Sequence, residues 1–286
     1  MVRGLEDRIF NSVSYAILAL VGLSAVVPLL YVFSVSLTPY AEVLKNGGYV
    51  LFPKEITFNA YKTLLSYSAI PQSFKITLFV TVVGTAINLI LTTLMAYPLS
   101  RKGLPGRRLF LFMVVFTLLF NGGIIPTYLI VKATGLIDTV WALIVPNAIW
   151  SFNVLVMKSF FENLPEELFE SARIDGAHEW RILLQIVIPL SVPSMITIGL
   201  FYAVGHWNSF FAAIMYITDR SLFPLQVVVR EILMMTQQPL ENAEDMVPTV
   251  TMQMSAVIFA SLPIIAVYPF LQKHFTKGML LGSIKG

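Results

Sequence analysis

The stretch ITLFVTVVGTAINLILTTLMAYPLS, residues 76–100, contains no Asp, Glu, Lys or Arg. A helix needs about 20 predominantly apolar residues to cross the hydrocarbon core of a bilayer, and this stretch is long enough. A charged side chain near the centre of a bilayer costs about 3 kcal/mol. An uncharged run of this length therefore indicates a membrane-spanning helix, and the number of such runs decides the fold.

Uncharged runs recur five more times along the chain, at residues 9–41, 109–131, 139–157, 182–218 and 246–272. We predict one transmembrane helix from each run, and we expect the first to stay in the protein rather than to be removed as a signal peptide. The predicted helices span residues 13–37, 73–99, 109–131, 139–160, 183–204 and 251–271. The expected fold class is an all-α integral membrane protein with six transmembrane helices.

The composition argues against other classes of protein. Of the 286 residues, 57% are hydrophobic and only 12% are charged, whereas about a quarter of a soluble domain is charged. A soluble bundle of buried helices would therefore lack the polar surface it needs. A β-barrel is disfavoured because the apolar runs are continuous rather than alternating. The absence of cysteine excludes a disulfide framework and thiol chemistry.

Basic residues predict the orientation in the membrane. The short segment 101–108 carries Arg101, Lys102, Arg107 and Arg108, and short basic loops stay in the cytoplasm. Six crossings place both termini on that same side, so we expect cytoplasmic termini. The net charge of +3 then reflects cytoplasmic loops and requires no nucleic-acid partner.

These assignments divide the chain into three parts. Residues 1–72 would form the first helix and first external segment, residues 73–275 a core of five helices, and residues 276–286 a cytoplasmic tail. A later external segment, 205–250, contains the acidic cluster Glu241, Glu244 and Asp245. Within it, the apolar stretch 209–218 is too short to span, so we expect a re-entrant or interfacial piece.

The long cytoplasmic loop 158–181 concentrates charge on an otherwise apolar chain. Pro165 suits a first helical position, and acidic residues in the next turn favour a helix N-terminus. An apolar stripe at a spacing of four residues is expected from Leu164, Leu168 and Ala172. With a turn at Gly176, the loop predicts two short helices at an angle.

The same loop contains a spaced motif. It reads Glu170-Ser171-Ala172-Arg173-Ile174-Asp175-Gly176-Ala177, and nine residues after Gly176 comes Ile186-Val187-Ile188-Pro189. This resembles the EAA loop of bacterial ABC importer permeases, in which E-A-A, three residues, G and nine residues precede I-x-L-P. Ser171 and Ile188 depart from the pattern, each by a mild exchange. The resemblance implies that the loop couples the chain to a separate ATPase through Glu170, Ser171, Ala172, Arg173, Asp175, Gly176, Ala177, Ile186 and Pro189.

The residue types in the motif fit that role. We expect the small Ala172 to let a helix seat closely in a partner's cleft and Gly176 to allow the turn. Glu170, Arg173 and Asp175 would pair with charges on the ATPase. Pro189 and Pro193 would bend the start of the fifth membrane helix.

Further segments resemble the carbohydrate branch of these permeases, related to the maltose system. The resemblance covers residues 70–286. It rests on the segments Asn121-Gly122-Gly123-Ile124-Ile125-Pro126-Thr127-Tyr128, His206-Trp207-Asn208 and Phe275-Thr276-Lys277-Gly278-Met279-Leu280-Leu281-Gly282-Ser283-Ile284-Lys285-Gly286. It implies the type I importer fold, a bacterial cell membrane location and a sugar or oligosaccharide substrate.

The resemblance also implies partners. These are a homologous second permease, two cytoplasmic ATPase subunits and an extracytoplasmic binding protein. No Gly-Lys pair occurs in the sequence, so a P-loop is absent. We therefore expect no cofactor and no enzymatic activity in this chain, with ATP and magnesium held by the ATPases.

Candidate substrate contacts are amide and aromatic residues near the expected cavity: Asn121, Tyr128, Asn147, Asn153, Trp207 and Asn208. Polar residues in membrane helices indicate function by default, but hydrogen bonding between helices is an open alternative. Trp207 could equally anchor the chain at the interface. The three histidines, His178, His206 and His274, have no metal-ligand spacing.

Alternative functions also follow from the sequence. A permease for a non-sugar solute would share the fold. An ion-coupled secondary transporter would need ionisable groups near mid-membrane, which the six predicted helices lack. A membrane enzyme would need convergent acid–base or metal-binding groups.

Overall fold

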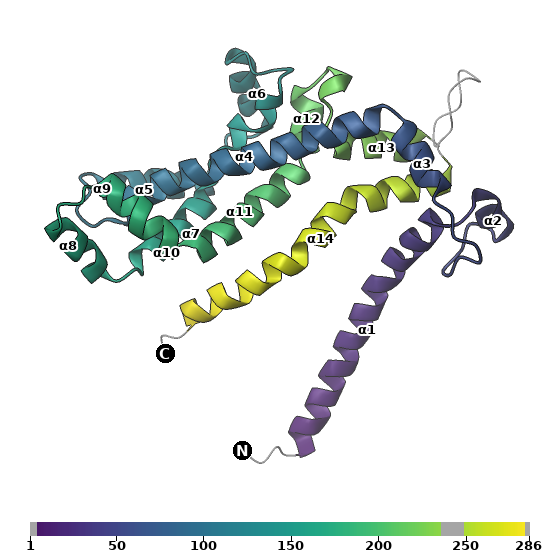
Figure 1. Cartoon of the computed structure of the whole chain (residues 1–286), viewed down its shortest axis with the longest axis horizontal. Helices are drawn as coiled ribbons and strands as arrows, with labels where there is room; N and C mark the ends of the chain where they lie inside the picture. The colour runs from purple at the N-terminus through teal and green to yellow at the C-terminus, as the bar shows by residue number, and fades with distance from the viewer. Residues whose placement is uncertain (1–4, 236–248, 284–286) are drawn as a thin grey trace. The chain divides into compact units, whose positions relative to one another are not determined.

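The computed structural model describes residues 5–235 and 249–283, and it describes side chains within 9–235, 249–267 and 269. Within these residues every regular element is a helix. The chain divides into two compact units, one of Met1–Ile70 with Val229–Leu262 and the other of Pro71–Val228 with Pro263–Gly286. Figure 1 shows the helices of each unit.

The first unit contains α1 (Leu5–Ser36), α2 (Tyr40–Lys45), α3 (Asn59–Ser66) and the beginning of α14 (Val250–Ser283). Its small core joins Val35 of α1 to Val43 and Val50 of the following segment. The Ser255 hydroxyl donates a hydrogen bond to the carbonyl of Ser36 at 3.2 Å. The apolar part of α1 is otherwise exposed within this chain. These are the surroundings of a membrane helix rather than of a soluble core.

The second unit is built on α4 (Ala69–Ser100), which packs with α5 (Arg107–Leu119), α7 (Ser151–Glu162) and α11 (Val192–Trp207). Ala96, Phe161 and Tyr202 are fully buried in the shared core. The Tyr202 hydroxyl bonds to Thr92 at 2.7 Å and accepts from the Trp150 backbone N–H at 3.1 Å. Hydrogen bonds between buried side chains thus hold α4 to α11.

The continuous helix predicted over residues 109–131 is wrong. The chain instead bends by 116° between α5 and α6 (Ile124–Ala133). Gly123 has a φ of 87°, and its N–H donates to the Asn121 side chain at 2.8 Å. A run of uncharged residues reports composition, whereas this turn depends on a glycine that reaches positive φ.

The continuous helix predicted over residues 139–160 is also wrong. Two short 3₁₀ helices, η1 (Val140–Leu143) and η2 (Val145–Asn147), precede α7, and the pair bends by 52°. Pro146 in η2 lacks a backbone donor, which weakens a regular helix at this point.

The fifth predicted helix begins as expected with a bend. It consists of α9 (Glu179–Ile182), the π-helical η3 (Leu183–Val187), α10 (Ile188–Leu190) and α11, with an 81° bend before α11. Pro189 and Pro193 lie on either side of the bend, which confirms their expected effect. Three helices are long and apolar enough to span a membrane, and the described residues give six crossings if each bent pair counts once.

The segment after α11 holds α12 (Phe211–Tyr216), η4 (Arg220–Leu222) and α13 (Leu225–Met235). Within the stretch 209–218 the chain forms the six-residue helix α12, and its re-entrant or interfacial placement stays a prediction. The sequence did not indicate α13. Glu241, Glu244 and Asp245 lie outside the described residues, as do the last three residues of the C-terminal motif.

Candidate functional site

The charged loop folds into two short helices at the end of the second unit, α8 (Glu166–Ile174) and α9, which confirms that prediction (Figure 1). Pro165 directly precedes α8 with a ψ of 129°, so it caps the helix rather than occupying its first position. This one-residue difference leaves the acidic first turn, with Glu166 and Glu167, as expected.

Gly176 ends α8 in a Schellman motif. Its φ is 78°, its N–H donates to the Arg173 carbonyl, and the Ala177 N–H donates to the Ala172 carbonyl at 2.9 Å. These two bonds satisfy carbonyls that the end of a helix leaves unpaired. A Cβ on Gly176 would meet open space, so the requirement is one of backbone conformation and not of room.

The buried face of α8 matches the predicted stripe only in part, since Ala172 is buried and Leu164 packs against the same core. Phe169 and Ala172 are buried in the core of the second unit, while Leu168 is exposed. The spacing of four was counted from Leu164, which lies before the helix begins. Ala172 is only 8% exposed, so its small side chain lets α8 pack against this chain itself and is not free to enter a partner's cleft.

The outer face of the α8–α9 segment remains open. Glu170, Ser171 and Asp175 are exposed on it. Ile174 is exposed on it as well, at 86%, whereas Trp180 in α9 is 63% exposed and lines the cavity beside α8. Exposed apolar groups of this size beside charges are typical of a protein interface.

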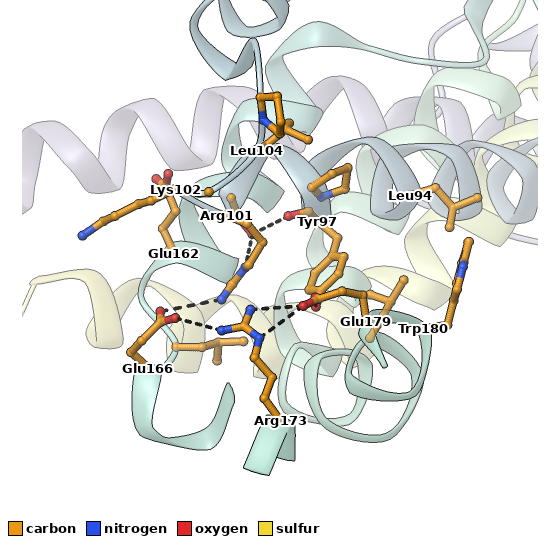
Figure 2. Close-up of a pocket in the computed structure, with 16 residues that line it drawn as sticks. Leu94, Tyr97, Arg101, Lys102, Leu104, Glu162, Glu166, Arg173, Glu179 and Trp180 are labelled. Carbon is orange, nitrogen blue, oxygen red and sulfur yellow. Dashed lines mark hydrogen bonds and ion pairs between the residues drawn. The ribbon is translucent and has the colours of Figure 1, made fainter. Parts of the chain in front are cut away.

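A network of charged groups lies on the inner side of α8 (Figure 2). Arg173 pairs with Glu179 at 3.1 Å and with Glu166 at 3.8 Å. Tyr97 donates a hydrogen bond to Glu179. Arg173, expected to pair with the ATPase, thus already has partners within this chain.

These groups line a cavity of 1210 Å³ between α8, α9 and the segment after α4. Arg101 enters it from the end of α4 and pairs with Glu166 at 3.7 Å. In the sequence, Arg101 indicates only the orientation in the membrane, because a contact between such distant segments leaves no local pattern.

The last part of the motif lies at the start of the fifth predicted membrane helix. Ile186 is half-buried in η3 and packs against the core of the second unit, and Pro189 is exposed in α10. A π-helical turn inside a helix often marks a functional position. The motif therefore runs from the exposed α8 directly into a bent membrane helix.

The candidate substrate residues are dispersed over the second unit, and none of them lines the cavity beside α8. Asn121 and Asn147 are exposed at the two helix breaks. Tyr128 stacks on Tyr216 with ring centroids 6.3 Å apart. Asn208 donates to the Val204 carbonyl at the end of α11.

The remaining two candidates are buried within this chain. Trp207 packs edge-on against Phe74, and Asn153 is 1% exposed with no hydrogen-bond partner for its amide atoms. Both side chains are thus covered within this chain, and their contact with substrate stays a prediction. Among the described residues, no group of His, Cys, Asp or Glu has the geometry of a metal site.

Comparison with known families gives the identity of the fold. The model of the family described as "Binding-protein-dependent transport system inner membrane component" matches residues 7–281. This chain belongs to that family. It is the permease subunit of an ABC importer, a multi-pass protein of the bacterial membrane. The chain is a transporter subunit and not itself an enzyme, and partner ATPases bind the ATP.

Similar proteins match this chain over nearly all of its residues. "Protein LplC" of Bacillus subtilis (strain 168) is 46% identical over 98% of this chain and 96% of its own length. The "Polygalacturonan/rhamnogalacturonan transport system permease protein YtcP" of the same organism is 42% identical, over 99% of this chain and 100% of its own length.

The structure resembles that of a solved importer. A chain in the crystal structure of a bacterial ABC transporter for the acidic polysaccharide alginate has a TM-score of 0.88 and 32% identity, with 96% of this chain and 99% of that chain covered. This confirms the type I importer fold that the motif implied.

Proposed function

We propose that this permease carries a sugar or oligosaccharide, delivered by an extracytoplasmic binding protein, across the bacterial cell membrane. The names of similar proteins support this substrate class. One is a permease for polygalacturonan and rhamnogalacturonan, and a transporter of known structure is involved in the import of alginate. The importer would contain a homologous second permease and two ATPase subunits. Both termini and the α8–α9 segment would face the cytoplasm.

The α8–α9 segment is the proposed site of coupling to the ATPase. The observation that carries this is its two-sided construction: Phe169 and Ala172 anchor α8 to the membrane helices, while Glu170, Ile174 and Asp175 remain exposed. A partner can therefore bind the outer face of α8 and displace this helix without unfolding it. Closure of the ATPases on ATP would then switch the permeases between inward- and outward-open states.

The substrate proposal is tested with the cognate binding protein. Titration calorimetry would compare oligogalacturonides, neutral oligosaccharides and amino acids as ligands. We expect tight binding of a saccharide, because the names of similar proteins point to that chemistry. Tight binding of an amino acid with no binding of any saccharide would overturn the carbohydrate assignment and leave the permease assignment intact.

The assembly is tested by affinity purification of the tagged permease from membranes. We expect one homologous permease and an ATPase to co-purify. Recovery of this chain as a homodimer with the ATPase would refute the second-permease proposal.

A further inference from the structure

Arg101 lies where three helices of the second unit meet. It follows the last residue of α4, and its side chain is only 13% exposed. Its guanidinium lies over the ring of Phe169 in α8, 3.8 Å from the ring centre, and also pairs with Glu166. A cation held over an aromatic face in a partly desolvated site is a stabilising contact.

The same guanidinium reaches α7. One of its nitrogens donates to the Phe161 carbonyl at 3.0 Å, near the end of that helix. The last carbonyls of a helix lack partners within the helix and attract positive charge. Arg101 therefore satisfies the end of α7 while it holds α8.

Arg107, nearby, contacts the ends of both α4 and α7. Its Nε donates to the Leu99 carbonyl at 2.8 Å, near the end of α4, and its guanidinium pairs with Glu162 at the end of α7. The ends of α4 and α7 are thus tied together, and Arg101 adds α8 to them.

The charges around the cavity argue against a separate ligand there. Its lining contains the cations Arg101, Lys102 and Arg173 and an equal number of anions, Glu162, Glu166 and Glu179. Such a lining favours neither an anion nor a cation. These charged groups form ion pairs mainly with one another, as expected of contacts that join α8 to its neighbouring helices.

We infer that Arg101 is a positioning residue that joins α8 to α4 and α7, so that a displacement of α8 moves the membrane helices with it. This inference rests on the proposed coupling function of the α8–α9 segment. A lysine cannot reproduce the connection, because it lacks the planar fork that stacks on Phe169 while donating in two directions.

The test uses the complete importer in proteoliposomes, with this chain as wild type, Arg101→Gln, Arg101→Lys or the control Arg108→Gln. Arg108 is an exposed cation of the same segment, so its variant matches the loss of charge. Import of a labelled oligogalacturonide and hydrolysis of ATP are measured together. We expect Arg101→Gln to lower the import per ATP about fivefold or more, the lower end of coupling between two sites, and Arg108→Gln to leave it unchanged.

A second measurement follows the helices without relying on substrate. The chain has no native cysteine, so spin labels on Ile90→Cys in α4 and Glu167→Cys in α8 report their separation. In the assembled wild type we expect one narrow distance distribution that ATP binding does not broaden. Arg101→Gln should broaden or split it when ATP binds, and Arg108→Gln should not.

The outcomes separate the two proposals. If no ATPase assembles with the wild type, the coupling function fails. If the wild type works and Arg101→Gln matches it in both measurements, the role of Arg101 alone is refuted. Should Arg101→Gln not assemble, Arg101→Lys decides: reduced coupling supports the role, whereas wild-type coupling shows that charge suffices and overturns it.

Discussion

At the scale of single residues, two of the positions with positive φ are Gly176, just after α8, and Asp138, before η1. The spacing of the motif predicted the turn at Gly176. It could not predict that open space surrounds the position, so that backbone conformation alone selects glycine there.

The loss of stability caused by a substitution at Gly176 should therefore depend on how readily the new residue adopts the left-handed backbone conformation. We expect Gly176→Ala to destabilise the end of α8 by about 1–2 kcal/mol, and Gly176→Asn to be milder because Asn enters this region more readily. The yield of ATPase co-purified with each variant measures the effect. Gly103→Ala, also in open space but without positive φ, is the control. Equal yields for all variants would contradict the Schellman ending.

Asp138 should give a pH-dependent contact. Backbone N–H groups of Asp219 and Thr218 donate to its carboxylate at 2.8 and 2.7 Å, and they lower the pKa of Asp138. Because the folded pKa lies below the unfolded value of about 3.9, the contact is fully present above that value and is lost as pH falls through the folded pKa.

Hydrogen exchange at the amides of Thr218 and Asp219 measures this contact. We expect protection at neutral pH that disappears in acid, and no protection at any pH in Asp138→Ala. Protection in Asp138→Ala equal to that of the wild type would show that other contacts order this loop.

At the scale of elements, the close packing of α4 on α11 depends on a glycine. A Cβ on Gly84 would lie 2.6 Å from Nε2 of His206. Both residues are buried, and packed interiors have little room to adjust. The helices thus approach more closely here than any larger residue at position 84 would allow.

We expect Gly84→Ala to destabilise the protein by about 1–3 kcal/mol through overpacking, seen as a lower thermal unfolding temperature in detergent. Adding His206→Ala should restore much of the loss, because it removes the clashing ring. Gly22→Ala in α1, where nothing lies near, serves as control. A Gly84→Ala protein as stable as this control would refute the close approach.

Uncharged runs predicted where the elements lie but not their direction. The run 109–131 covers most of both α5 and α6, whose 116° bend arises at Asn121 and Gly123. Likewise, the residues of the charged loop predicted two short helices, while the side of α8 that faces the core depends on where the helix begins. The pairing of Arg101 with Phe169 joins distant segments, so only the fold reveals it.

At the scale of the whole molecule, the account depends on α8 and α9 lying at the cytoplasmic surface in contact with the ATPase. The family and the fold are those of an ABC importer permease. The location of this contact on the chain is our proposal, and it requires the outer face of α8 to be covered in the assembled importer.

Thiol cross-linking tests this claim most directly, because the chain has no native cysteine. Ser171→Cys on the outer face of α8 and Lys132→Cys in α6 would be compared in the assembled importer. We predict that Ser171→Cys cross-links to the ATPase and resists a membrane-impermeant thiol reagent added outside intact cells, whereas Lys132→Cys reacts with that reagent and does not cross-link. Labelling of Ser171→Cys from outside, with cross-linking of Lys132→Cys to the ATPase, would contradict the account.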